Sequence, residues 1–418
     1  MIDRLPVGPD TAAPMAARVR AMLPAPTAVR EVVAGIIASI ADAGDDALRM
    51  HERRFGGGEG DLRVPADELA AALDALDPAV RAGLEVAIEN VGAVARAGVG
   101  EDRTVTLRQG HSVTLRELPV ARAAVYAPGG RNPYPSTVVM GVITARAAGV
   151  GEIVVAAPSH PVILAACALC GADEVHRMGG AQAVAALALG TESIAPVDVI
   201  VGPGNLYVQE AKRQLSGRVG IDGFAGPSDL LVLASTGADP HAVALDLLAQ
   251  GEHGRDSLVA VVSDDSALLN AIGREVQALD RDRPTVAAGP KVLVDAHGLE
   301  AALAFAEALA PEHLELIGDA AEALAPRITR AGCVFVGVES ATAFGDYVAG
   351  SNHTLPTAGA ARFASGLNAG HFRRRMSEVR VGDAAAALAE AGVPIAKSEG
   401  FAVHAESMSA RIRQNRTS

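Results

Sequence analysis

From residue 112 onward, short β-branched runs that end at glycine or proline alternate with helical runs. Each strand-like run leads into a turn, and segments with apolar helical patterns separate these runs. Strand and helix alternating at this rhythm predict a parallel sheet with helices on its faces. The strand-like runs of the first series are RAAVYAPGG, EIVVAAPS, EVHRMGG and VDVIVGPGN, and the helical runs between them include PVILAACALCGA and GAQAVAALALG.

The alternation restarts with the segment GPSDLLVLAS and continues through CVFVG. We therefore expect an α/β fold with two Rossmann-like parallel-sheet units. Residues 28–97 carry apolar residues at three-and-four spacing, which predicts a helical N-terminal region. Residues from about 365 onward predict a small, mostly helical C-terminal tail domain rather than more sheet.

These patterns suggest limits for the domains. We expect an N-terminal tail at residues 1–22 and a first α/β unit built from residues 23–110 and 228–366. The second α/β unit is expected at residues 111–227, and the tail domain at residues 367–418.

The composition favours a compact protein that acts on a diffusible small molecule. Half of the 418 residues are apolar, so the chain can bury a large core. The formal net charge of -13 opposes binding to nucleic acid or to anionic lipid, because the long-range field has the wrong sign. The most apolar stretch, Ile153 to Cys170, is interrupted by Pro158 and Pro161 and is too short to span a bilayer. No signal-peptide pattern opens the chain, so we expect a cytoplasmic location.

The three cysteines do not suggest a disulfide framework or a metal site. Cys167 and Cys170 form a C-x-x-C, but it lies inside an apolar helical pattern with no second pair to complete a metal site. Cys333 stands alone. We expect Cys167 and Cys170 to be small hydrophobic residues of the core.

Three glycine-rich loops follow predicted strands, although the chain has no G-x-G-x-x-G motif. They are Tyr126–Arg131, Gly179–Gln182 and Gly202–Asn205. Ligands of open parallel sheets bind outside the carboxyl ends of strands, where glycine lets the backbone approach a ligand closely. Each loop taken alone is also compatible with ordinary turn chemistry.

Two short segments carry side chains that suit metal binding or proton transfer. Gln250 and His253 lie three positions apart near the end of an amphipathic helix and share one face. Because glutamine is an unusual metal ligand, the pair taken alone favours a solvated helix face. Glu312 and His313 follow an apolar helix that Pro311 ends, and they offer two proton acceptors of different basicity. A polar entrance to a strand is the alternative.

Two further segments combine carboxylates with imidazoles. Residues 345–356 place Asp346, Asn352 and His353 in a loop bounded by glycine and proline, with too little apolar content for a packing element. Near the C-terminus, Glu399 and His404 lie in a short apolar segment, where a surface-exposed pair is the alternative.

Read together, these segments resemble the histidinol dehydrogenase family, in the same order and from about residue 25 to residue 413. Eight matching segments in one order are not a chance arrangement. They are VYAPGGRNPYPSTVVM, GGAQAVAALALGTESI, DVIVGPGNLYV, GIDGFAGPSDLLVLA, DLLAQGEH, APEHLEL, GDYVAGSNHTLPT and EGFAVH.

The resemblance implies roles for individual residues. It places the NAD contacts in the second α/β unit and the metal and catalytic residues mostly in the first. Glu312 and His313 take the acid/base role. The implied NAD contacts are Tyr126, Gln182 and Asn205; the zinc ligands are Gln250, His253, Asp346 and His404; the substrate contacts are Ser228, Gln250, His253, His313, Asp346, Glu399 and His404.

The resemblance also implies the reaction and the assembly. The expected activity is the last step of histidine biosynthesis, a zinc-dependent, NAD-linked oxidation of L-histidinol through bound L-histidinal to L-histidine. His313 would accept the alcohol proton, and Glu312 would activate water for the second oxidation. In this family the tail reaches across a twofold homodimer, so Glu399 and His404 would complete the neighbouring chain's site.

The sequence leaves three alternative functions open. A paralogous zinc and NAD dehydrogenase could oxidise another polar alcohol such as a sulfonated diol, since Asp229 stands where the family usually has glutamate; Glu399 favours a cationic amino group instead and repels a sulfonate. A zinc hydrolase would use Glu312 or Asp346 without NAD. A non-catalytic binding module would have no use for four metal ligands beside Glu312 and His313.

Overall fold

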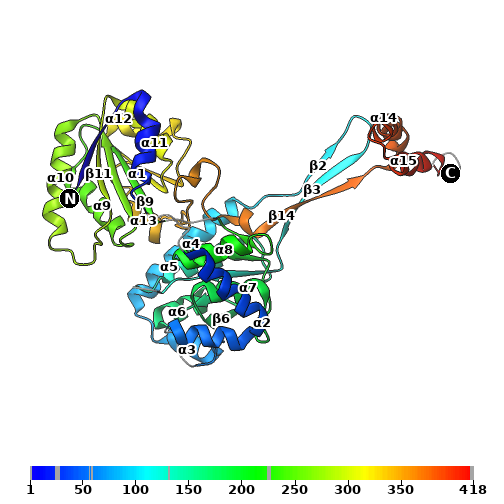
Figure 1. Cartoon of the computed structure of the whole chain (residues 1–418), viewed down its shortest axis with the longest axis horizontal. Helices are drawn as coiled ribbons and strands as arrows, with labels where there is room; N and C mark the ends of the chain where they lie inside the picture. The colour runs from blue at the N-terminus through cyan, green and yellow to red at the C-terminus, as the bar shows by residue number, and fades with distance from the viewer. Residues whose placement is uncertain are drawn as a thin grey trace. The chain divides into compact units, whose positions relative to one another are not determined.

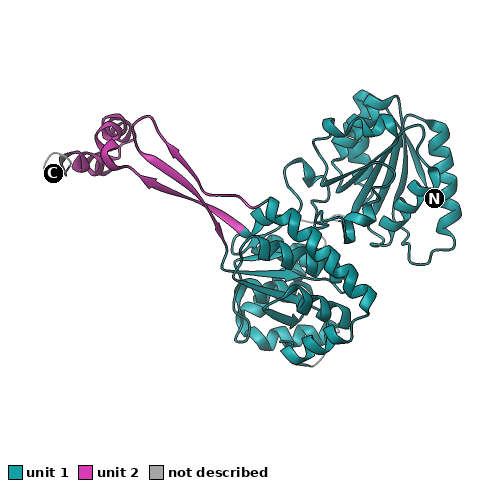
Figure 2. Cartoon of the chain, turned by 180° about the vertical axis from the view of Figure 1, so that it is seen from behind, with its two compact units in different colours: residues 1–98, 120–372 teal, residues 99–119, 373–418 magenta. Residues whose placement is uncertain are grey.

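The computed structural model describes residues 2–23, 29–55, 57, 60–129, 132–223 and 227–414. The chain divides into two compact units, which Figure 2 shows in two colours. The larger unit holds residues 1–98 and 120–372, and the smaller one holds residues 99–119 and 373–418. No helix among the described residues is long and apolar enough to cross a membrane.

The first sheet of the larger unit has six parallel strands in the order β1-β11-β10-β9-β12-β13. Its alternating side chains enter two separate cores, as the period of two in a strand requires. Helices α1 and α11 cover one face of this sheet, and α9 and α10 cover the other (Figure 1). The strands are β1 (Asp3–Val7), β9 (Asp229–Ala234), β10 (Leu258–Ser263), β11 (Lys291–Ala296), β12 (His313–Ile317) and β13 (Cys333–Val336). The helices are α1 (Ala12–Arg20), α9 (Pro240–Gly251), α10 (Ser266–Asp280) and α11 (Leu299–Leu309), followed by the short α12 (Asp319–Glu322) and α13 (Thr342–Tyr347).

The second sheet has five parallel strands in the order β6-β5-β4-β7-β8. Helices α2, α7 and α8 pack on one face, and α5 and α6 lie on the other, where α4 packs on α5 and α3 packs on α6 (Figure 1). The strands are β4 (Arg122–Tyr126), β5 (Glu152–Ala157), β6 (Glu174–Arg177), β7 (Val199–Val201) and β8 (Gly220–Ile221). The helices are α2 (Arg30–Phe55), α3 (Ala66–Asp74), α4 (Pro78–Ala97), α5 (Pro135–Ala147), α6 (Pro161–Cys170), α7 (Gly180–Leu189) and α8 (Leu206–Leu215).

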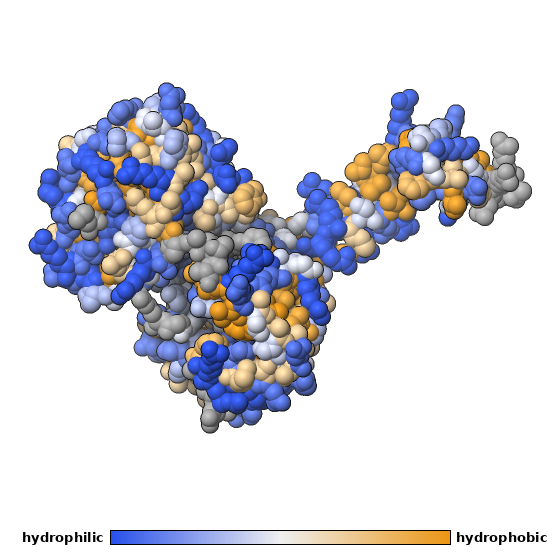
Figure 3. Space-filling model, in the orientation of Figure 1, coloured by the Kyte–Doolittle hydropathy of each residue, from blue (hydrophilic) through white to orange (hydrophobic). Residues whose placement is uncertain are grey.

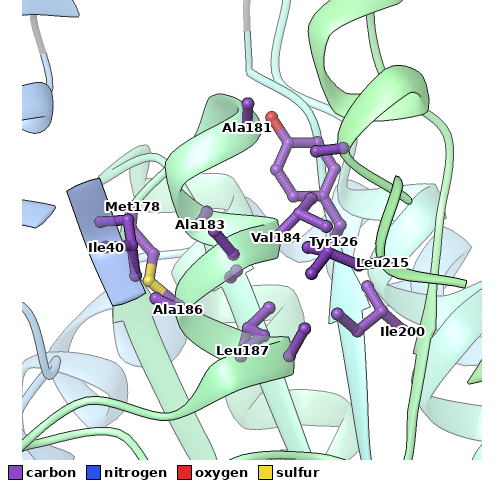
Figure 4. Packing of buried hydrophobic residues seen from close by; sticks show 14 of the residues in the cluster. Ile40, Tyr126, Met178, Ala181, Ala183, Val184, Ala186, Leu187, Ile200 and Leu215 are labelled. Carbon is purple, nitrogen blue, oxygen red and sulfur yellow. The ribbon is translucent and has the colours of Figure 1, made fainter. Parts of the chain in front are cut away.

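The core of the second sheet is aliphatic and rich in alanine. Small side chains let α7 lie close to the sheet, and the ring of Tyr126 packs beside the N-terminal end of this helix (Figure 4). Cys167 and Cys170 are buried free thiols of α6, and burial raises the pKa of both, so the prediction that they are core residues is confirmed.

The smaller unit combines an antiparallel sheet with a helical hairpin. Strands β14 (Arg373–Arg380), β3 (Ser112–Pro119) and β2 (Arg103–Thr106) pair in this order, and α14 (Ala385–Ser398) packs against α15 (Ala402–Gln414). The hairpin exposes several large apolar side chains, and Figure 3 shows hydrophobic surface on this unit. They are Ile395, Phe401 and Val403.

The predicted fold class is confirmed, but the structure differs from the predicted domain limits. Residues 1–22 are no separate tail, because β1 joins the edge of the first sheet beside β11 and buries Leu5 and Val7. Residues 30–97 cover the second sheet instead of the first, because the apolar faces of α2, α3 and α4 contact α7, α6 and α5. Strand β3 pairs with both β14 and β2, so the tail domain contains a sheet and begins earlier in the sequence. Helix periodicity shows which face of a helix is apolar but does not show which sheet that face covers.

Two helical glycines give a matched test of packing. Glycine in a helix interior is less stable than alanine by about 0.5–1 kcal/mol, so Gly83→Ala on the open face of α4 should stabilise the protein by about this amount. A methyl group at Gly141 of α5 would overlap the Val125 side chain of β4, so Gly141→Ala should destabilise it by about 1–3 kcal/mol. Urea unfolding of both variants beside the wild type measures the two free energies. Equal effects of the two substitutions would contradict the close contact of α5 with β4.

Candidate active site

A cavity of about 1600 Å³ runs through the larger unit and is lined by residues of both sheets. On the second sheet, the lining residues follow the carboxyl ends of β4, β6 and β7, as expected for open parallel sheets. On the first sheet, Ser228 and Glu312 precede β9 and β12, so the cavity meets the amino ends of those strands. The carboxyl edge of one sheet therefore shares a cavity with the amino edge of the other.

The three loops predicted to contact a dinucleotide all line this cavity. The Tyr126 hydroxyl accepts a hydrogen bond of 3.0 Å from the backbone N–H of Gly180. Gln182 is buried on the first turn of α7. Asn205 caps α8 through Oδ1, which accepts from the N–H groups of Tyr207 and Val208, so its amide nitrogen is the group available to a ligand. The loop predicted at Tyr126–Arg131 is described only up to Gly129, because Gly130 and Arg131 lie outside the described residues.

A buried ion pair fixes the loop that carries Asn205. Lys212 Nζ donates to the carbonyl oxygen of Gly202 at 2.8 Å and pairs with Asp222. The other oxygen of Asp222 accepts from the Gly202 N–H at 2.7 Å. Gly202 has a φ of 117°, and a side chain here would collide with the backbone of Tyr126, so only glycine brings the two loops this close.

On the first sheet, Ser228 connects the predicted catalytic carboxylate to a predicted metal ligand. Its hydroxyl donates to Glu312 Oε2 at 2.5 Å and accepts from Gln250 Nε2 at 2.5 Å. The backbone N–H of Asp229 adds a second bond to Glu312 Oε2 at 3.0 Å. Burial raises the pKa of Glu312 to about 7, against the opposing effect of these hydrogen bonds. A carboxyl group with this pKa can take up and release a proton near neutral pH.

The same network orients the amide of Gln250. Because Nε2 is committed to Ser228, the carbonyl oxygen Oε1 points away from it, and Oε1 is buried with no hydrogen-bond partner among the described residues. An unsatisfied buried carbonyl costs free energy unless something binds it. His253, one turn further on, lines the cavity and is exposed.

His313 is held as a neutral base. Its Nδ1 lies 3.2 Å from the carbonyl oxygen of Asp229, which can only accept, so Nδ1 carries the hydrogen and Nε2 has the free lone pair. Burial lowers the pKa of His313 and favours the neutral ring. Nε2 lies 3.9 Å from an oxygen of Asp346. The structure thus brings Glu312, His313 and Asp346 together.

Residues 345–356 connect the site to the second sheet. His353 lies between the carbonyl oxygen of Asp346, 2.9 Å from Nδ1, and the Thr137 hydroxyl of α5, 3.1 Å from Nε2. Asn352 donates to the carbonyl oxygen of Met140 at 3.1 Å. These two side chains therefore dock the loop that carries Asp346 onto α5.

The remaining predicted site residues, Glu399 and His404, belong to the smaller unit. Glu399 follows α14, and His404 lies on α15 with its ring 5.1 Å from that of Phe401. Among the described residues, no group of three or more His, Cys, Asp or Glu side chains is arranged to hold a metal ion. Of the four predicted zinc ligands, Gln250, His253 and Asp346 lie in the larger unit, and His404 lies in the smaller one.

Sequence reasoning missed the burial of three carboxylates, of which Glu52 lines the cavity. Asp229 accepts from the N–H of Glu312 at 2.8 Å, and Glu52 accepts from Gln182 at 2.9 Å. Glu315 of β12 is almost fully buried, and its Oε1 accepts from both the N–H and the hydroxyl of Thr342. Glu315 stands two positions after His313 on the same face of the strand, which is a signal that the sequence does contain.

The comparisons with known proteins find histidinol dehydrogenases among the relatives of this chain. The sequence model described as histidinol dehydrogenase matches residues 23–412. Histidinol dehydrogenase of Streptomyces avermitilis is 40% identical over 99% of this chain and 98% of that protein, and that of Cereibacter sphaeroides is 43% identical over 92% of each. The crystal structure of histidinol dehydrogenase from Elizabethkingia anophelis superposes with a TM-score of 0.92 and 30% identity, covering 100% of this chain and 99% of the other.

The buried carboxyl of Glu315, which lies near Asp246, gives a pH test of stability. Burial and the nearby charge of Asp246 raise the pKa of Glu315 to about 8. In the unfolded chain this carboxyl ionises near its ordinary pKa, so its burial lowers stability progressively as pH rises from about 4.5 to about 8. Glu315→Gln removes this effect, and between pH 5 and pH 8.5 the variant should gain about 4 kcal/mol relative to the wild type, since one pKa unit corresponds to about 1.4 kcal/mol.

Urea unfolding at both pH values measures the difference. Glu300→Gln is the control, because Glu300 is an exposed partner of Arg327 and its replacement should bring no such gain. A stability difference that does not change with pH would contradict the burial of a proton at Glu315.

Proposed function

The chain belongs to the histidinol dehydrogenase family, and on that premise we propose that it oxidises L-histidinol to L-histidine in two successive NAD-linked steps at a zinc-dependent site. The observation that carries the proposal is the pairing of a neutral imidazole at His313 with a carboxyl of raised pKa at Glu312 in one cavity. The two oxidations need two proton acceptors of different basicity. The diol dehydrogenase and hydrolase readings are not favoured, since the matched relatives are histidinol dehydrogenases.

The residues suit a dinucleotide. The cavity is larger than the roughly 300–1000 Å³ of ordinary ligand sites, so it has room for a cofactor and a substrate together. The three glycine-rich loops line this cavity, and the close approach of Gly202 to the Tyr126 backbone brings two of them together. Tyr126, Gln182 and Asn205 would hold the NAD.

The residues also suit a zinc ion. Gln250 Oε1 is a buried carbonyl without a partner, and His253 and Asp346 line the same cavity. One amide oxygen, one carboxylate and two imidazoles are ligands that borderline-soft zinc accepts, and His404 would be the second imidazole. Ser228 fixes the amide so that its oxygen is available.

When bound, zinc would hold the substrate's nitrogens and NAD would accept the hydride. For the first oxidation, His313 Nε2 accepts the proton of the alcohol, because Nδ1 is already committed to the Asp229 carbonyl. The hydrogen bond from His313 Nδ1 to the Asp229 carbonyl oxygen keeps the ring in this orientation. Asp346, 3.9 Å from Nε2, stabilises the positive charge that the ring gains.

For the second oxidation, Glu312 takes a proton from the water that adds to the aldehyde. The Ser228 hydroxyl and the Asp229 N–H both bond to Oε2, so Oε1 is the oxygen left to face the water. The buried surroundings that raise the pKa of Glu312 also make its anion a stronger base. Substrate contacts at Ser228 and Asp346 are consistent with their places on the cavity wall.

We extend the proposal to the assembly. The larger unit supplies three zinc ligands, and Glu399 and His404 lie in the smaller unit, which exposes Ile395, Phe401 and Val403. Large apolar side chains exposed together favour a protein partner. A homodimer in which each tail completes the partner's site satisfies both observations, and Glu399 would then bind the cationic amino group of L-histidinol.

Replacing Glu312 separates the two oxidations. The wild type should form two NADH per L-histidinol, and Glu312→Gln should slow the oxidation of L-histidinal about 100-fold while slowing alcohol oxidation less than about 10-fold. Glutamine keeps an acceptor for Ser228 and Asp229 but cannot take up a proton. Single-turnover NADH absorbance with each substrate measures the steps, and Glu300→Gln on the surface is the matched control. Equal losses in both steps would remove Glu312 from water activation.

Mixing two inactive variants tests the exchange of tails. His253→Ala and His404→Ala should each lose most activity and bound zinc. If His404 serves the neighbouring chain, a heterodimer of the two variants has both defects in one site and leaves the other site native. Recovered activity near a quarter of wild type is then expected at about statistical subunit exchange. Heterodimers that form without any recovery would place the tail on its own chain.

A further inference from the structure

One end of the cavity is formed by α2 and carries apolar side chains. Val32 is 55% exposed, Met50 46% and Phe55 55%, so the cavity wall here offers apolar surface that a ligand can cover. His51 stacks on Phe55 with ring centroids 6.0 Å apart and an interplanar angle of 6°. Flat aromatic and apolar surface of this kind suits the purine of a dinucleotide.

A carboxylate lies at the same end. Glu52 of α2 lines the cavity but is only 5% exposed. Its Oε1 accepts from the Gly179 N–H at 3.0 Å and from Gln182 Nε2 at 2.9 Å. Both of these bonds end on one oxygen, and the N-terminal turn of α7 is thereby occupied by an anionic side chain.

This arrangement determines which ligand groups the α2 end accepts. A helix N-terminus in a dinucleotide fold often binds phosphate, but here Glu52 already satisfies the Gly179 N–H and repels a second anion. A carboxylate can only accept hydrogen bonds, so it selects hydroxyl donors such as the 2′- and 3′-hydroxyls of a ribose. A 2′-phosphate at this position would place two anions together in a poorly solvated site.

We propose that Glu52 binds the adenosine ribose hydroxyls of the dinucleotide and makes this site select NAD over NADP. The inference rests on the proposed NAD-linked function and adds to it a residue outside the three glycine-rich loops. Glu52 also positions Gln182, since the carboxylate holds its amide on the first turn of α7.

Two arginines near Glu52 should increase the effect that removing its charge has on the preference for NAD over NADP. Arg54 and Arg177 also line this end; Arg54 lies over the Phe55 ring, 5.4 Å from its centroid, and Arg177 pairs with Glu68. With Glu52 present, its charge offsets theirs at the ribose. Without that charge, the two guanidinium groups remain to attract a 2′-phosphate.

The test measures the direct binding of NADH and NADPH to the full-length protein. Nucleotide fluorescence reports the binding, and no alcohol substrate is present. The wild type should bind NADPH at least about tenfold more weakly than NADH, and Glu52→Gln should lower this ratio about tenfold or more, chiefly by tightening NADPH. Glutamine keeps an oxygen that can accept from Gly179 and Gln182. Glu152→Gln is the matched control. Glu152 is the first residue of β5, at the amino end of the strand and not in the cavity lining, so this variant should keep the wild-type ratio.

Glu52→Asp is the second variant: it retains the charge, so it should keep the preference for NADH even if it binds both nucleotides more weakly. An unchanged ratio in Glu52→Gln, or a wild type that binds NADPH as well as NADH, overturns the proposal for Glu52 and leaves the proposed function intact. Absence of any NADH binding by the wild type overturns the proposed function itself.

Competition in the unmutated protein gives an answer that does not depend on the folding of a variant. AMP should displace NADH, and adenosine 2′,5′-bisphosphate should do so at least about tenfold less well, because only the second ligand brings a 2′-phosphate to Glu52. Equal displacement by the two nucleotides overturns the proposal.

Discussion

The docking of residues 345–356 on α5 holds the active site together. Asn352 bonds to the Met140 carbonyl, and His353 bridges Thr137 and the Asp346 carbonyl. Helix α5 is buried on nearly every side, so polar groups that reach it must find partners there. These bonds hold Asp346 in the cavity that the glycine-rich loops of the second sheet also line. The shared cavity depends on this contact, because neither sheet contributes all of the lining.

The site is built from buried acids and bases whose ionisation the fold opposes. Burial raises the pKa of Asp229 and Glu312 to about 7 and lowers that of His313. Each of these groups lies at the amino end of β9 or β12, and each is tied to another by a backbone or side-chain hydrogen bond. Burying these groups lowers the stability of the fold, and the same burial shifts their pKa values to where they can exchange protons near neutral pH. Ser228 extends the network to Gln250 and so couples the orientation of a metal ligand to that of the base.

The two halves of the cavity follow different rules. On the second sheet, glycines after parallel strands bring backbone close to a ligand, as they do in other nucleotide-binding folds. On the first sheet, the chemistry sits at the amino ends of the strands, where chain segments arriving from α9 and α11 deliver Gln250 and Glu312. The Glu52 carboxylate accepts from the Gly179 N–H, so an anionic side chain already occupies the N-terminus of α7.

Strand and helix periods are local properties, so the amino-acid sequence was enough to predict the class of fold. It also located three glycine-rich loops and the Glu312-His313 pair. Family resemblance added the assignment of roles. Long-range packing was needed to show that β1 completes the first sheet, that α2 to α4 cover the second, and that Glu52, Asp229 and Glu315 are buried. The reason is physical: an apolar face or a lone carboxylate has the same local pattern whichever surface covers it. Long-range packing alone determines its neighbours and therefore its ionisation.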